Sequence, residues 1–272
     1  MEDRKVSGGG GVQIHVVETG NPRGRPILFL HGVSQCWLTW DRQMNSGLAE
    51  KYRLVAMDLR GHGLSDKPRD AYQDSQLWAD DVHAVIEELK LDHPVLSGWS
   101  YGPLVFFDYV RYYGEERIGG LHMVGGVTKL GSDDALAVLT PEFLGIFSDF
   151  LSTETEATVR GLETLVRLCY SPEPCAEEKF RMLGYNVSVP PYVRQGMFSR
   201  SLNNDDLLAR IRKPVLITQG GADAVVKPAA ADVHKAAMPH AELHRMPNAD
   251  HAAFWSDATG FNQRLQEFCE SL

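Results

Sequence analysis

The stretch that decides the fold runs from Pro94 to Val110 and reads Pro-Val-Leu-Ser-Gly-Trp-Ser-Tyr-Gly-Pro-Leu-Val-Phe-Phe-Asp-Tyr-Val. The apolar run at its start predicts a buried strand, and the apolar-rich segment from Pro103 onward predicts a helix. Between them, Gly98-Trp-Ser-Tyr-Gly102 predicts a sharp turn that projects the Ser100 hydroxyl out of the sheet. Glycines suit a turn whose neighbouring backbone leaves no room for side chains. Proline suits the first helical position, where its missing N–H has no partner to lose.

Apolar runs and helical patterns alternate on either side of this turn. Val12–Glu18 alternates apolar and polar residues, which predicts a half-exposed antiparallel strand. Short continuous apolar runs, typical of strands buried on both faces of a parallel sheet, occur at 26–30, 54–57, 94–96, 121–124 and 214–218. Helical patterns lie between them, and a terminal helix is predicted over Phe261–Leu272. The fold class is therefore α/β, with a mostly parallel central sheet flanked by helices.

The alternation stops between residues 127 and 204. Apolar residues recur there at helical spacing, and no strand-like run follows until Pro214. We therefore expect an all-helical cap over 127–204, inserted between the two parts of one core, 1–126 and 205–272. The segment carries eight aromatic residues; most are expected in the cap's own core, and a few lining a pocket would favour an apolar acyl or aryl substrate.

Composition excludes several classes of protein. The 272 residues are 43% hydrophobic and 23% charged, which excludes disorder and collagen-like fibres. The net charge of −9 argues against a nucleic-acid or anionic membrane partner and disfavours strongly anionic substrates. The four cysteines and the histidines show no metal-binding spacing, so we expect no metal and free thiols. The first residues lack the apolar core of a signal peptide, and a cytoplasmic protein without a membrane partner is expected.

The residues after two other apolar runs suit nucleophilic catalysis. A serine hydroxyl needs a base to remove its proton and an acid to orient that base. Asp223 follows the run at 214–218, and His251 lies in the loop before the terminal helix. Asp250 is the rival acid, but it adjoins His251 and is poorly placed to reach that ring. The predicted catalytic set is Ser100, Asp223 and His251.

Five motifs together carry a family resemblance: Leu30-His-Gly-Val33, Asp58-Leu-Arg-Gly-His-Gly-Leu-Ser65, Gly98-Trp-Ser-Tyr-Gly102, Gly220-Gly-Ala-Asp223 and His251. Over nearly its whole length the chain resembles α/β-hydrolases of the lidded esterase, perhydrolase and C–C hydrolase type. The resemblance implies an oxyanion hole formed by the backbone N–H groups of Val33 and Tyr101. It also implies a bracing role for Asp58, Arg60 and His62. Pro103 departs from the pattern, since many relatives carry a further glycine there.

The resemblance implies a serine hydrolase, without cofactor, that cleaves a carboxylic ester of a small to medium, mainly apolar molecule through an acyl-serine intermediate. Lactonase, perhydrolase and C–C hydrolase activities share the same residues and stay open. Haloalkane dehalogenases and epoxide hydrolases of this fold use an aspartate nucleophile, where this chain has Ser100. A ligand receptor on a retained hydrolase scaffold is the alternative from another class, and it predicts ligand binding without turnover. The sequence does not determine the oligomeric state.

Overall fold

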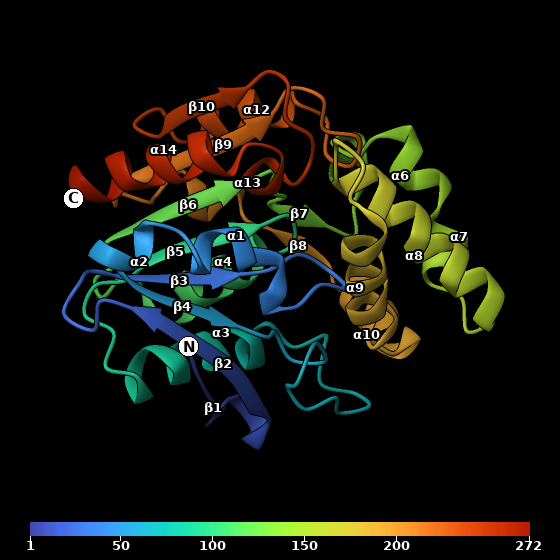
Figure 1. Ribbon diagram of the computed structural model, residues 1–272, viewed down its shortest axis with the longest axis horizontal. Coiled ribbons are helices and arrows are strands. Elements are labelled where there is room, and N and C mark those ends of the chain that lie inside the picture. Colours follow the sequence, from blue (N-terminus) through green and yellow to red (C-terminus); the bar gives the residue numbers. More distant parts are fainter.

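A computed structural model describes residues 1–272 and shows an eight-stranded central sheet with the order β1-β2-β4-β3-β5-β6-β9-β10 (Figure 1). The first two pairings, β1 with β2 and β2 with β4, are antiparallel, and all later pairings are parallel. The mostly parallel sheet predicted from the apolar runs is therefore confirmed. The strands are β1 (Glu2–Ser7), β2 (Gln13–Gly20), β3 (Pro26–Leu30), β4 (Arg53–Met57), β5 (Val95–Trp99), β6 (Gly120–Val124), β9 (Val215–Gly220) and β10 (Glu242–Met246).

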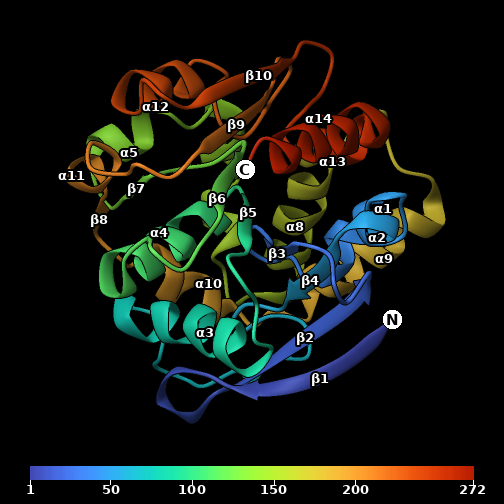
Figure 2. The same cartoon turned by 90° about the vertical axis from the view of Figure 1, so that its left-hand side faces the viewer.

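Helices cover both faces of this sheet, as Figure 2 shows. One face carries α3 (Ser75–Glu88), α4 (Gly102–Tyr113) and α12 (Ala230–Ala237). The other carries α1 (Asp41–Met44), α2 (Leu48–Lys51) and α14 (Ala258–Glu270), with α13 (Ala253–Ser256) and the 3-10 turn η2 (Trp37–Trp40) beside them. None of the helices combines the length and the apolar character that crossing a membrane requires.

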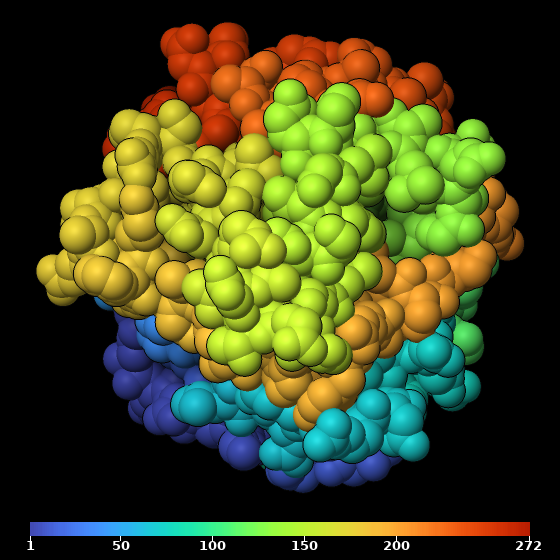
Figure 3. Space-filling model, turned by 90° about the vertical axis from the view of Figure 1, so that its right-hand side faces the viewer, coloured from blue at the N-terminus to red at the C-terminus, as the bar shows by residue number.

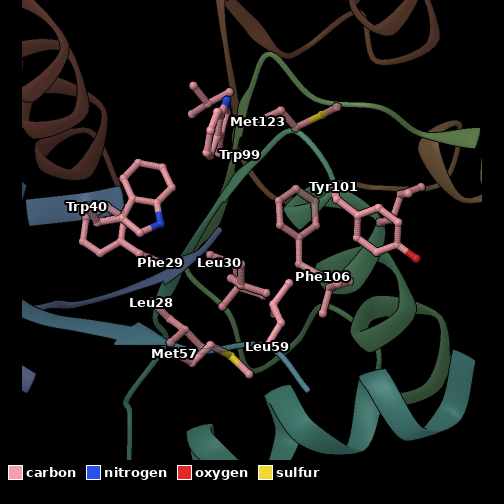
Figure 4. Close-up of a cluster of buried hydrophobic side chains, with 14 of the residues drawn as sticks. Leu28, Phe29, Leu30, Trp40, Met57, Leu59, Trp99, Tyr101, Phe106 and Met123 are labelled. Atoms are coloured by element: carbon pink, nitrogen blue, oxygen red, sulfur yellow. The ribbon is translucent and has the colours of Figure 1, made fainter. Parts of the chain in front are cut away.

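The centre of the sheet shows why its strands are continuous apolar runs. Along β3, Phe29 points to one face, where its ring lies 4.9 Å from that of Trp40, and Leu30 points to the opposite face beside Phe106 (Figure 4). All four of these side chains are fully buried. A strand covered by helices on both sides needs an apolar residue at every position, and each such side chain contributes roughly 1.5–3 kcal/mol on burial.

The cap segment, residues 127–204, lies over one end of the sheet (Figures 1 and 3). It is helical apart from two short strands, β7 (Lys129–Leu130) and β8 (Leu202–Asn203), which pair antiparallel near its two ends. Two-residue strands are too short to produce an alternating pattern, so they were not predicted. The helices are α5 (Asp133–Ala137), α6 (Pro141–Gly145), α7 (Phe147–Phe150), α8 (Thr155–Cys169), α9 (Ala176–Val187) and α10 (Pro191–Phe198), and α11 (Asp205–Leu208) follows.

The N-terminal hairpin differs from expectation. Strand β2 is antiparallel, as predicted, but residues 14–17 are buried rather than alternately exposed. The reason is that β1, which was not predicted, pairs along its outer edge, while α2 and α3 pack on it. The glycine-rich turn η1 (Gly9–Gly11) between the two strands is tied to α3, because the N–H of Gly9 donates to the carboxylate of Asp81 at 2.9 Å.

Candidate active site

Ser100 lies on a strained turn between β5 and α4. Its φ of 58° falls in the left-handed region, which a residue with a side chain rarely adopts. The flanking glycines are sterically required. A Cβ on Gly98 would lie 2.7 Å from the backbone nitrogen of Pro103, and one on Gly102 would lie 2.5 Å from the carbonyl oxygen of Leu30. The sequence therefore builds a turn that holds the serine hydroxyl at the end of the strand.

His251 and Asp223 form a hydrogen-bonded chain with this serine. The Ser100 Oγ lies 2.9 Å from Nε2 of His251, and the Nδ1 of that ring lies 2.9 Å from Oδ2 of Asp223. This arrangement fits a ring that donates from Nδ1 to the carboxylate and accepts the serine proton at Nε2. The other carboxylate oxygen accepts the backbone N–H groups of Val225 and Val226, each at 2.8 Å. The structure thus brings together the three side chains that the sequence singled out.

Two further side chains support this chain and were not found from the sequence. Nε2 of Gln219 donates to Oδ2 of Asp223 at 2.9 Å, and the indole N–H of Trp99 donates to the carbonyl of His251 at 2.9 Å. Gln219 lies within β9, four residues before Asp223. The one available signal was an amide side chain directly after the apolar run at 214–218.

Asp250, the rival acid, has other partners. Its Oδ1 accepts the backbone N–H of Ala252 and the hydroxyl of Ser256, at 3.1 and 2.6 Å. Burial raises the pKa of this carboxyl to about 6. Asp250 makes no hydrogen bond to the imidazole of His251. Asp223 is therefore the carboxylate that contacts this ring.

The backbone N–H groups of Val33 and Tyr101 donate to no acceptor within the protein. Both residues line, together with Ser100, a cavity of about 220 Å³. Two free backbone donors beside a nucleophilic hydroxyl are the arrangement that stabilises negative charge on a reacting carbonyl oxygen.

Two buried histidines hold the loop that carries Val33. The Nδ1–H of His31 donates to the carbonyl of Gly32 at 2.7 Å, and its Nε2 accepts the N–H of Leu59 at 3.0 Å. Nε2 of His62 accepts the N–H of Ser34 at 3.1 Å. Burial lowers the pKa of both rings, to about 3 for His62. Both rings therefore stay neutral at pH 7, and each keeps one unprotonated nitrogen that accepts a backbone N–H.

The remaining loop residues brace the site in a similar way. Asp58 accepts the backbone N–H groups of Trp37 and Leu64, at 2.7 and 2.9 Å. Arg60 is fully buried and forms an ion pair with Asp81 at 2.7 Å. The bracing role that the family resemblance implied for this loop matches these contacts.

The cavity is lined by side chains from the core and the cap segment. Val225 and Val226 form its core wall beyond Asp223, and Leu139, Phe143, Phe147 and Phe198 form its cap wall. Three of the eight cap aromatics thus line the cavity, and the other five do not. Nowhere in the chain do three His, Cys, Asp or Glu side chains lie close enough to hold a metal ion.

Comparisons with known proteins agree with this architecture. The family model described as alpha/beta hydrolase fold matches residues 25–258. The chain is 27% identical to the AB hydrolase superfamily protein YisY of Bacillus subtilis, covering 96% of each protein. It is 31% identical to a soluble epoxide hydrolase of Corynebacterium sp., over 68% of this chain and 67% of that one. The crystal structure of the esterase RhEst1 from Rhodococcus sp. superimposes over all of both chains with a TM-score of 0.95 and 32% identity. The chain is therefore a hydrolase that belongs to the alpha/beta hydrolase fold family.

Proposed function

We propose that this hydrolase cleaves carboxylic esters of small, mainly apolar molecules through an acyl-serine intermediate. The observation that carries the proposal is the unbroken hydrogen-bonded chain Asp223–His251–Ser100, which ends in a cavity lined by two free backbone donors. In such a chain the imidazole makes the serine nucleophilic at neutral pH, and the carboxylate stabilises the imidazolium that forms.

The first half of the reaction forms the acyl-enzyme. Ser100 Oγ attacks the ester carbonyl while Nε2 of His251 takes its proton. The negative charge that develops on the carbonyl oxygen is stabilised by the N–H groups of Val33 and Tyr101. The imidazolium of His251 then returns the proton to the departing alcohol oxygen, and the acyl group stays on Ser100.

The second half releases the acid. A water molecule takes the place of the alcohol, and Nε2 of His251 removes its proton as the oxygen attacks the acyl-serine carbonyl. The same two backbone donors stabilise the second oxyanion. Collapse of this intermediate returns the proton to Ser100 Oγ and frees the carboxylic acid, so His251 ends in its starting state.

The cavity favours a short or aromatic acyl group. Twelve of its seventeen lining residues are hydrophobic, and its volume of about 220 Å³ suits a small group rather than a long chain. Phe143, Phe147 and Phe198 offer aromatic edges and faces to such a group. Apolar walls contribute binding energy without competing for the hydrogen bonds of the ester carbonyl.

The serine at position 100 separates this proposal from epoxide opening. One relative of this chain is a soluble epoxide hydrolase. Epoxide hydrolases of this fold open the ring with an aspartate nucleophile, which forms an alkyl-enzyme ester. A serine attacking an epoxide would instead form an ether, which water and His251 could not hydrolyse. The proposal therefore follows the esterase relative.

Hydrolysis of 4-nitrophenyl acetate and butyrate by wild type and by Ser100→Ala tests the proposal. We expect the substitution to reduce kcat by at least about 10³-fold. Ser97→Ala is the matched control, because Ser97 lies on the same strand but its hydroxyl bonds His122, outside the cavity. Equal activity in wild type and Ser100→Ala would contradict the proposal. A single burst of nitrophenol without further turnover would instead favour a ligand receptor.

A further inference from the structure

The cavity beside Ser100 has one cationic side chain in its lining, Lys129 of β7. Its ammonium is already engaged. The Nζ lies 2.7 Å from Oδ2 of Asp205 and 3.8 Å from Oδ2 of Asp134. The hydrogen bond to Asp205 is the main cause that raises the pKa of Lys129 above its ordinary value.

The two carboxylates that pair with the ammonium lie outside the cavity of Ser100. Asp134 and Asp205 line a neighbouring cavity of about 280 Å³, which shares Lys129 with the first cavity, and neither carboxylate lines the cavity of Ser100. The Lys129 side chain is 19% exposed, and the two carboxylates are far more exposed. Lys129 therefore forms part of the wall of the cavity of Ser100, while the carboxylates that pair with its ammonium line the neighbouring cavity.

The same ion pair joins the two ends of the cap segment. Lys129 lies where the chain leaves the core, and Asp205 lies at the start of α11, where the chain has returned. The backbone of Lys129 in β7 pairs with that of Asn203 in β8. Asp205 follows Asn203 by two residues, so this pairing brings Asp205 beside Lys129. The position of the lysine is thus fixed by the fold at this point, and the flexible stem leaves its ammonium free to turn if Asp205 releases it.

An anionic acyl group would find no partner in the cavity as it stands. The walls are mainly apolar, the ammonium of Lys129 is paired with Asp205, and the carboxyl side chain in the lining, Asp133, has the same sign of charge as the substrate would. A carboxylate that loses water without gaining a cation is strongly disfavoured.

We propose that Asp205, assisted by Asp134, holds Lys129 away from the substrate and thereby restricts the site to uncharged acyl groups. Releasing Lys129 converts the same cavity into one that accepts an acyl group ending in a carboxylate. This inference rests on the proposed ester hydrolysis and identifies Asp205 and Lys129 as determinants of its specificity.

A pair of matched substrates tests the inference: 4-nitrophenyl pentanoate and the mono-4-nitrophenyl ester of glutaric acid, whose acyl chains have the same number of carbons. Wild type is expected to show a kcat/KM about 100-fold higher for the pentanoate. Asp205→Asn is expected to raise kcat/KM for the glutarate ester about tenfold, since a charged hydrogen bond to the freed lysine becomes available. The value for the pentanoate should stay within twofold.

Two controls separate the freed lysine from a simple loss of negative charge. Asp206→Asn removes the next carboxylate on α11, which is as exposed as Asp205 (54% against 56%) but pairs with Arg111. This substitution should leave kcat/KM for both esters unchanged. In Lys129→Met/Asp205→Asn the gain for the glutarate ester should disappear, because the stem remains and the charge is gone.

The outcomes distinguish this inference from the proposal beneath it. If pentanoate hydrolysis is lost in Ser100→Ala, three results would overturn the inference alone. They are no gain in kcat/KM for the glutarate ester in Asp205→Asn, a gain that persists without the Lys129 ammonium, and equal kcat/KM for both esters in wild type. Pentanoate hydrolysis that survives Ser100→Ala would overturn the proposed function and this inference with it.

Discussion

Nη1 of Arg200 donates a hydrogen bond of 3.0 Å to the hydroxyl of Tyr101. Arg200 lies two residues after α10, near the end of the cap segment, and Tyr101 directly follows Ser100. The same guanidinium forms a buried ion pair with Asp108 of α4 at 2.5 Å. The cap is therefore anchored to the residue whose free backbone N–H lies next to Ser100, and to the helix that follows it.

Breaking this anchor should destabilise the protein strongly. Arg200→Met leaves the Asp108 carboxylate buried without its cation, so we expect the free energy of unfolding to fall by about 3–5 kcal/mol in urea denaturation. Adding Asp108→Leu to this variant removes the stranded charge and should restore at least about half of the loss. A loss below about 1 kcal/mol in the single variant would show that the pair contributes little.

Asp223 and Asp250, the two acids considered as partners of His251, should differ sharply in how much their substitution lowers kcat. Asp223→Asn is expected to reduce kcat by about 10³–10⁴-fold, because the amide cannot stabilise the imidazolium of His251. Gln219→Leu, which removes one donor to Asp223, should reduce kcat about tenfold at nearly constant KM. Asp250→Asn should keep kcat within about threefold of wild type. Steady-state kinetics with 4-nitrophenyl butyrate would measure all three, and a larger effect at Asp250 than at Asp223 would reverse the assignment.

The turn around Ser100 should not tolerate a single methyl group. Gly98→Ala places a Cβ 2.7 Å from the backbone nitrogen of Pro103, so the turn has to shift. A displacement of the serine by about 1 Å should lower kcat about 100-fold. Gly184→Ala on α9 is the matched control, since a Cβ there meets nothing within 4 Å, and it should stabilise the helix by about 0.5–1 kcal/mol without changing kcat. An active Gly98→Ala enzyme would mean that the turn is less tightly packed than the structure shows.

Two buried histidines should make the free energy of unfolding depend on pH in mild acid. Burial lowers the pKa of His62 and His122 to about 3, whereas the unfolded chain titrates near the ordinary value of 6.5. Below pH 6.5 these two residues bind protons in the unfolded chain but not in the folded protein, so the stability that they contribute is lost as pH falls from 6.5 toward 3. Each ring contributes a slope of about 1.4 kcal/mol per pH unit.

Urea denaturation at pH 7.5, 6 and 5 measures this slope. His122→Asn removes one buried ring outside the active site and should lower the slope by about 1.4 kcal/mol per pH unit between pH 6 and 5. A slope that is unchanged in the variant would contradict the expected titration.

The fold was predictable because its strands are buried on both faces. Continuous apolar runs such as 26–30 have no other simple explanation when helical patterns alternate with them. The outer strand β1 lacks this signal, because five of its six residues are exposed and only Val6 is buried. Its pairing with β2 buries a strand that the alternation of apolar and polar residues predicts to be half-exposed.

The candidate site was predictable where chemistry demands a particular residue type at a strand end, as for Ser100, Asp223 and His251. Arg200 acts through contacts with Tyr101 and Asp108, which lie far away in the chain, and nothing in its local sequence marks it. Gln219 contacts Asp223 only four residues later, but an amide at the end of an apolar strand does not by itself indicate that contact. The same holds for the Lys129–Asp205 pair, since its two members are joined only by the pairing of β7 with β8.

Covalent labelling of Ser100 tests the central claim most directly. An organophosphate with a 4-nitrophenol leaving group should be attacked by the activated hydroxyl and leave a stable phosphoryl adduct. Mass spectrometry of the digested protein should find one adduct per chain, on the peptide that carries Ser100, with a matching loss of esterase activity. Ser100→Ala should remain unlabelled. An adduct on another residue, or full activity after stoichiometric labelling, would contradict the account.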